Sequence, residues 1–238
     1  MAAFSFLPLF AHTMNASLFA PVDLYCERLS PAFWAEPVNA LSNLGFFVAA
    51  FCAWRLLKSY SAPTSRSAWI LTLMIAVIGI GSFLFHTVAE RWALLADVIP
   101  ISLYQILFLA FYLRQVARLS LPGVGAWVIA FFAISYGVST LPDQWLNGSL
   151  SSYGSAWLFI AGLGVYHWRS GKQEPQALLL AVAVFSLSLL FRSADMAVCK
   201  YLSIGTHMFW HLSNSIVLYL TTRAFIVNLA FVPRPGQR

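Results

Sequence analysis

The chain has 238 residues, of which 60% are hydrophobic and only 9% are charged, and its mean hydropathy is +0.76. Soluble domains carry about a quarter of charged residues, so this composition excludes an ordinary soluble protein and indicates a membrane protein. The net charge of +6 is explained by basic residues at the ends of apolar segments. It therefore gives no reason to expect a nucleic acid as a partner, and no protein partner is implied.

Seven apolar stretches are long enough to cross a membrane, since a hydrocarbon core of about 30 Å requires about 20 residues of helix. The stretches lack the alternating pattern of lipid-facing β-strands. We predict an all-α bundle of seven transmembrane helices in a single integral-membrane domain, 1–238. The expected helices are 38–57, 67–88, 92–113, 121–141, 151–168, 176–198 and 203–226, with an exposed N-terminal segment at 1–37 and a short tail at 227–238.

The distribution of basic residues predicts the orientation, because cytoplasmic loops keep an excess of Lys and Arg. If the N-terminus is outside, ten of the fourteen basic residues fall on the inner side. We therefore expect the N-terminus outside and the C-terminus in the cytoplasm. The short loops and tails favour a bacterial inner membrane, and the alternative is the membrane of the endoplasmic reticulum or Golgi.

Five polar residues interrupt the predicted helices near one side of the membrane: Ser82 and His86 in the second, Asp97 in the third, and His207 and His211 in the seventh. Polar side chains are costly to insert into a bilayer, so each is a functional candidate. Residues four apart share one helix face. Even-numbered helices end on the outer side and odd-numbered helices begin there, so we expect the three imidazoles and the carboxylate to converge.

Three histidines with one open coordination position are typical of a catalytic zinc, whose bound water ionises near neutral pH. The alternative is that each histidine only hydrogen-bonds a neighbouring helix. The positions of Ser82 and Asp97 at helical spacing favour the zinc interpretation. His12 and His167 lack such neighbours and are expected at the surface or at an interface.

Three motifs together resemble the alkaline ceramidases: "YCERLSPAFWAEPVNALSN" (25–43), "GSFLFH" (81–86) with Asp97 eleven residues after its histidine, and "GTHMFWH" (205–211). These enzymes belong to a superfamily of seven-helix hydrolases that also includes the adiponectin and progestin receptors. The resemblance implies a zinc-dependent amidase that cleaves the N-acyl bond of ceramide-type lipids, releasing a fatty acid and a sphingoid base.

The resemblance also implies a role for each polar residue. His86, His207 and His211 would bind zinc, and Asp97 would act as general base, taking a proton from water and passing it to the leaving amine. Ser82 would hydrogen-bond the developing oxyanion or orient the water. The expected partner is a ceramide-like membrane lipid that enters sideways from the outer leaflet.

A calcium site is a further implication, since acidic and carbonyl oxygens before the first helix bind calcium in eukaryotic members. The available carboxylates are Asp23, Glu27 and Glu36, and oxygen ligands suit this cation. Leu24 and Leu29 stand where further oxygen ligands are expected. The alternative is a solvated acidic turn in which Glu36 caps the first helix.

The family also pairs cysteines at the positions of Cys26 and Cys199, both on the oxidising side, so we expect a disulfide there. Cys52 is expected to be a small core residue. Arg192 and Asp195, three residues apart, also occur in the family motif, and a salt bridge that shapes the loop after the sixth helix is favoured over a catalytic role.

Three alternatives to a ceramidase remain. The first is a zinc hydrolase of another lipid amide or ester, which would use the same residues. The second is a receptor-like member without strong hydrolysis, and Asp97 and Ser82 beside the expected ligands favour an enzyme over it. The third is a transporter with histidine proton relays, which is disfavoured because the polar residues gather on one side.

Overall fold

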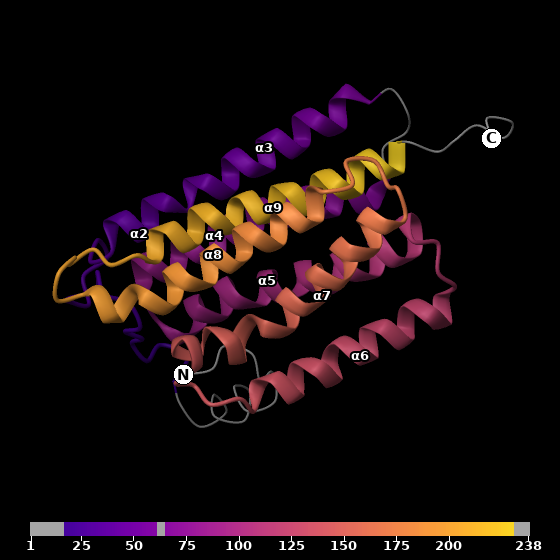
Figure 1. The fold of residues 1–238 in the computed structure, drawn as a ribbon. Helices are drawn as coiled ribbons and strands as arrows, with labels where there is room; N and C mark the ends of the chain where they lie inside the picture. Colours follow the sequence, from indigo (N-terminus) through magenta and orange to yellow (C-terminus); the bar gives the residue numbers. More distant parts are fainter. Residues whose placement is uncertain (1–16, 61–64, 231–238) are drawn as a thin grey trace, which may run out of the picture.

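The computed structural model describes residues 17–60 and 65–230, which form a bundle of helices without a β-strand (Figure 1). The helices are α2 (Pro37–Ser42), α3 (Leu44–Ser59), α4 (Arg66–Val88), α5 (Arg91–Phe111), α6 (Leu121–Ser139), α7 (Ser149–Arg169), α8 (Ala177–Val198) and α9 (His207–Ala230). A π-helical turn (Tyr112–Val116) extends α5, and a 3₁₀ turn (Trp145–Gly148) precedes α7. Since α2 and α3 meet at Asn43, the chain forms the seven predicted helical segments.

Five segments of the described chain are long and apolar enough to cross a membrane: α2 with α3, α4, α5 with its π-helical turn, α6 and α8. The helices α3 and α6 lie at opposite edges of the bundle (Figure 1). Both expose large apolar side chains, including Phe51 and Trp127. Because soluble monomers rarely expose large apolar patches, this surface supports the membrane assignment.

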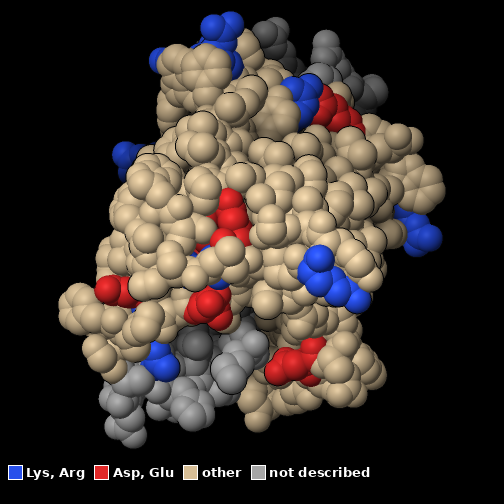
Figure 2. All heavy atoms as spheres, turned by 90° about the vertical axis from the view of Figure 1, so that its left-hand side faces the viewer, with Lys and Arg blue, Asp and Glu red and all other residues tan. Residues whose placement is uncertain are grey.

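The end of the bundle at which α2 begins presents a largely uncharged surface (Figure 2). The charged side chains on this face carry both signs and lie scattered among uncharged residues. This surface fits a membrane interface better than it fits a polyanion.

Several helix boundaries differ from the predicted ones, including the end of α9 at Ala230, which was predicted at 226. Two of the differences have identifiable reasons. The helix α9 begins at His207, four residues later than predicted, because Gly205 adopts a left-handed φ of 63°. Asp195 then accepts hydrogen bonds from the amides of Thr206 and His207 and so caps α9 from another helix. The third segment continues to Val116 through the π-helical turn, three residues beyond its predicted end.

The described part of the N-terminal segment has many exposed residues, and it also contacts the helices. The amide of Val22 donates to the carbonyl of Ala89 at 2.8 Å, and the amide of Arg91 donates to the carbonyl of Ala20 at 3.1 Å. The segment thus folds over the turn between α4 and α5. Four of its polar or sulfur-bearing side chains are buried: Cys26, Glu27, Arg28 and Glu36.

The helices α4 and α5 approach closely at Gly81, where an added Cβ would overlap the carbonyl oxygen of Ala96. Only glycine permits so close a backbone contact without displacement. The next residue on each helix is a predicted site residue, Ser82 on α4 and Asp97 on α5. The glycine therefore sets the distance between these two side chains.

Candidate metal centre and its cavity

The three predicted histidines converge at one point inside the bundle. His86 comes from α4, and His207 and His211 come from the first turns of α9. Their ring centroids lie 4.5–5.1 Å apart, and each residue is at most 2% exposed. One ligand atom from each lies within 4.8 Å of the other two, and no second group of this kind occurs in the described residues.

Hydrogen bonds to the far side of two rings leave their other nitrogens available for a metal. Glu36 Oε2 lies 2.6 Å from His86 Nδ1; because a carboxylate only accepts, this nitrogen carries the proton, and in the neutral ring Nε2 keeps its lone pair. Ser42 Oγ lies 2.7 Å from His211 Nδ1. His86 Nε2 and His207 Nδ1 are buried without a hydrogen-bond partner among the described residues. Such orphaned groups are costly, and a bound metal would satisfy them.

Glu36 is held in its charged form behind His86. Arg28 Nε donates to Glu36 Oε1 at 2.5 Å, and Asn39 Nδ2 donates to Oε2 at 3.1 Å. Burial opposes ionisation, but the interactions with His86 and Arg28 outweigh it and lower the pKa of Glu36 below its ordinary value. A carboxylate that orients a metal-ligating histidine is a common outer-shell arrangement, so this contact also fits a metal centre.

The ligand set fits a transition metal. A tetrahedral zinc with Zn–N bonds of about 2.0–2.1 Å separates its ligand nitrogens by roughly 3.3 Å, so an ion would draw the three imidazoles together. Imidazole also suits copper, iron and nickel. Three imidazoles therefore do not by themselves select zinc among these metals.

Ser82 and Asp97 lie beside the histidines. Ser82 Oγ is 3.4 Å from His211 Nε2, and the Asp97 carboxyl group interacts with the Ser82 hydroxyl. Asp97 Oδ1 is buried and has no hydrogen-bond partner among the described residues. Ser82, Asp97 and His211 all line one cavity of about 580 Å³.

The cavity extends from this polar end far into the bundle. On α5 its lining residues include Asp97 and Phe108, which are eleven residues apart and thus roughly 17 Å apart along the helix axis. The N-terminal segment and the helices α3 to α9 form the rest of the wall, and most of the lining side chains are apolar, such as Ile101, Phe131 and Leu163. A long apolar cavity with a polar end is suited to a hydrocarbon chain that carries a polar group.

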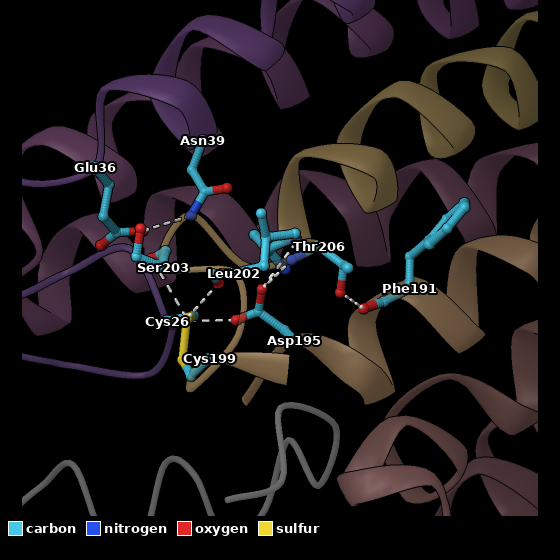
Figure 3. The surroundings of a disulfide bond; sticks show 10 residues. Cys26, Glu36, Asn39, Phe191, Asp195, Cys199, Leu202, Ser203 and Thr206 are labelled. Atoms are coloured by element: carbon cyan, nitrogen blue, oxygen red, sulfur yellow. Dashed lines mark hydrogen bonds between the residues drawn. A yellow bond between two sulfur atoms is a disulfide. The ribbon is translucent and has the colours of Figure 1, made fainter. Parts of the chain in front are cut away.

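The N-terminal segment closes over the histidines. The Tyr25 ring stacks on the His207 ring, with centroids 3.6 Å apart and an interplanar angle of 22°. Cys26 and Cys199 lie at disulfide distance with their Cα atoms 5.5 Å apart, so the structure brings the expected pair together. Asp195 Oδ2 accepts from the amide of Cys26 at 2.9 Å, beside the disulfide (Figure 3).

The predicted salt bridge between Arg192 and Asp195 is wrong. Both oxygens of Asp195 accept from backbone amides, which compete successfully for the carboxylate. Arg192 instead lines the cavity, where Nη1 donates to Ser149 Oγ at 3.0 Å. Its guanidinium carbon lies 5.3 Å from the centre of the Tyr153 ring and 5.9 Å from that of Trp210. Asp195 does shape the loop, but without Arg192.

The carboxylates considered for calcium have other partners. Glu27 accepts from the amides of Val38 and Asn39, both at 2.8 Å, and so makes the cap on α2 that the alternative had assigned to Glu36. Glu36 accepts hydrogen bonds from Arg28 and Asn39 and contacts His86. Asp23 is exposed. Within the described ranges these three carboxylates form no cluster that could hold a metal ion. Calcium binding stays a prediction.

Of three minor predictions, one is confirmed in one of its two alternatives, one fails and one lies outside the described residues. His167 is fully buried, with its ring nitrogens 2.7 Å from the Tyr112 hydroxyl and 3.0 Å from the carbonyl oxygen of Gln173, so it is an interface residue and the surface alternative is wrong. Cys52 is exposed on α3 and is not a core residue. His12 lies outside the described residues.

The sequence did not reveal four contacts of the site: those of Tyr25, Arg28, Glu36 and Ser42 with the histidines or with one another. All four residues lie in the first quoted motif (25–43), which was the only signal that this segment matters. Tyr25 contacts His207 and Glu36 contacts His86, and the two residues of each pair are at least 50 positions apart in the sequence. The local sequence pattern therefore could not identify these partners.

Fold and site together define a class: a helical membrane protein in which a buried three-histidine centre stands beside a lipid-sized cavity. A sequence model of the ceramidase family matches residues 24–232, which is most of the chain. The chain therefore belongs to the ceramidase family, and this membership implies a hydrolase acting on amide bonds. Among curated proteins none matches the chain.

Proposed function

We propose that the protein is a zinc-dependent intramembrane amidase that hydrolyses the N-acyl bond of ceramide-type lipids to a fatty acid and a sphingoid base. The observation that carries the proposal is the shared cavity, in which Ser82, Asp97 and His211 lie at the polar end of a long apolar space. Membership of the ceramidase family supports an amide bond as the target.

In this proposal His86, His207 and His211 hold the zinc ion. Zinc would supply Lewis-acid chemistry, which polarises an amide carbonyl and lowers the pKa of water. Glu36 and Ser42 orient the rings of His86 and His211 through the hydrogen bonds to their Nδ1 atoms, and this prevents the ligands from turning away.

Asp97 and Ser82 handle the proton and the developing charge. Asp97 takes a proton from the attacking water as its oxygen adds to the amide carbon, and it gives this proton to the nitrogen as the C–N bond breaks. Ser82 donates its hydroxyl proton in a hydrogen bond to the carbonyl oxygen while that oxygen gains negative charge. One water is consumed, and a carboxylic acid and an amine leave.

We further infer that the centre lies near the outer face of the membrane, with the N-terminus outside and the C-terminus in the cytoplasm of a bacterial inner membrane. The count of ten inner basic residues against four outer ones supports this orientation,. The scissile amide of a two-tailed lipid lies at headgroup depth, which is the level of the histidines in this arrangement. One hydrocarbon tail then occupies the apolar cavity.

The first test is the metal content of the purified protein in detergent, measured by elemental analysis together with the release of fatty acid from a labelled ceramide. We expect about one zinc per chain, lost together with activity in His207→Ala and His211→Ala. Zinc without ceramide turnover would support the metal centre and indicate that the substrate is another lipid amide or ester. A folded wild-type protein that takes up no zinc would refute the proposal.

A further inference from the structure

Arg192 is a cation inside the cavity that the proposed reaction does not use. It lines the same cavity as Asp97 and His211, and it lies within electrostatic reach of Asp97 and His207. No described carboxylate forms an ion pair with its guanidinium. Buried charges are normally paired, so this side chain is available to an anion that enters the cavity.

The guanidinium is fixed in a defined orientation. Nη1 donates to Ser149 Oγ, the hydroxyls of Tyr25 and Tyr153 also interact with the group, and the Tyr153 and Trp210 rings lie close to the guanidinium carbon. Nε is buried and has no hydrogen-bond partner among the described residues. The planar guanidinium of Arg192 is thus held by its neighbours and has one N–H group without a partner. Its geometry matches that of a carboxylate.

Two other arginines show what a satisfied guanidinium looks like in this chain. Arg28 holds Glu36 through Nε. Arg223 holds Glu174 through two nitrogens, at 2.8 and 2.5 Å. Arg192 differs from both because it lines the cavity that is also lined by His211 of the three-histidine centre.

Resting on the proposed hydrolase function, we propose that Arg192 binds a carboxylate of the lipid beside the three-histidine centre. The carboxylate has two chemical sources: the fatty acid that hydrolysis releases, or a head group that carries a carboxylate, as in an N-acyl amino acid. If Arg192 instead only held Tyr25 and Tyr153 in place, it would be a positioning residue and would show no preference for anions.

The decisive measurement is the binding of palmitate and of hexadecanol, which is neutral and equally long, to the full chain in detergent. Arg192→Gln should weaken palmitate binding roughly ten- to hundredfold, which is the value of a charge-assisted hydrogen bond, and leave hexadecanol binding unchanged. Arg192→Lys should retain part of the palmitate affinity, because it keeps the charge and loses the fork. Arg55→Gln, exposed on α3, is the matched control and should bind both as wild type does. Unchanged palmitate binding in a folded Arg192→Gln variant would overturn the proposal.

Turnover of two lipids separates the sources of the carboxylate. N-palmitoylglycine carries a carboxylate in its head group, and N-palmitoylethanolamine carries a hydroxyl in the same place. A selective loss of kcat/KM for the glycine lipid in Arg192→Gln supports the head-group source, whereas equal turnover with weaker palmitate binding supports the released fatty acid.

Two further outcomes distinguish the failure of each proposal. An equal loss of turnover for both lipids with unaltered palmitate binding would assign Arg192 a positioning role and overturn the carboxylate site. If the wild type hydrolyses neither these lipids nor ceramide but still binds palmitate in an Arg192-dependent way, the carboxylate site stands and the hydrolase function fails.

Discussion

The two ends of the bundle each bury a histidine completely, and the two histidines differ in one respect. His167 has partners for both ring nitrogens, the Tyr112 hydroxyl and the carbonyl of Gln173. His86 has a partner for Nδ1 in Glu36, but its Nε2 has none among the described residues. Burial is therefore the same at both ends, and the unsatisfied Nε2 distinguishes His86, a candidate metal ligand, from His167, which joins helices.

The largest expected effect comes from removing one histidine at either end. His86→Ala should abolish both zinc binding and hydrolysis, because it removes one of three ligands. His167→Ala should keep both and lower the free energy of unfolding by about 1–3 kcal/mol, since it leaves buried partners unsatisfied. Elemental analysis, ceramide hydrolysis and thermal unfolding would measure these effects. Loss of zinc from a folded His167→Ala protein would remove the distinction between the two ends.

The next effect separates the metal ligands from the proposed base. Asp97→Asn keeps the size of the side chain but cannot accept a proton, so kcat should fall by about 10²–10⁴-fold while the zinc content stays at the wild-type value. Hydrolysis of labelled ceramide beside elemental analysis would show this. A variant that hydrolyses ceramide at the wild-type rate would rule out Asp97 as the base.

Cys26 and Cys199 lie at disulfide distance at the end with the candidate metal centre, so a disulfide between them would brace this end covalently. Cys199→Ser should lower the free energy of unfolding by about 2–4 kcal/mol, as is typical for the loss of a disulfide, and Cys52→Ser should change it little because Cys52 is exposed on α3. Thermal unfolding in detergent, with and without a reductant, measures both. If reductant leaves the wild-type transition unmoved, the two cysteines do not brace this end.

The smallest effect concerns one carboxylate at each end of the bundle: Glu36, which contacts His86, and Glu174, which pairs with Arg223. Glu36→Gln should weaken zinc binding or activity by about 10–100-fold, the usual cost of losing an outer-shell partner. Glu174→Gln removes a half-exposed ion pair with Arg223, which is worth about 0–1 kcal/mol, and should leave zinc binding unchanged. Zinc titration of both variants tests the contrast. Equal zinc affinities would show that Glu36 does not support His86.

Much of this architecture follows from patterns that a sequence displays locally. Hydrophobic length predicted seven helical segments, and four-residue spacing predicted that His207 and His211 share a face. The convergence with His86 followed from the direction of successive helices, without any knowledge of contacts. These features depend on period and order, which the sequence contains directly.

The contacts between distant segments could not be predicted in the same way. The spacing of Arg192 and Asp195 permitted a salt bridge, but backbone amides 11 or more positions away in the chain took the carboxylate. Glu36 was a plausible calcium ligand or helix cap, and it became the partner of a histidine 50 positions away. Such choices depend on which groups compete for one carboxylate in the folded chain, and a single sequence does not report that competition.

The contact between Tyr25 and His207 also constrains when the centre can form during synthesis. Tyr25 leaves the ribosome before the described helices, and α9, which carries two of the three histidines, leaves it after the other described helices. The three histidines therefore come together only after α9 has been made and has packed beside α4, and Tyr25 can stack on His207 only then. A chain that lacks α9 has no three-histidine site, so any chemistry of this site requires that α9 has folded.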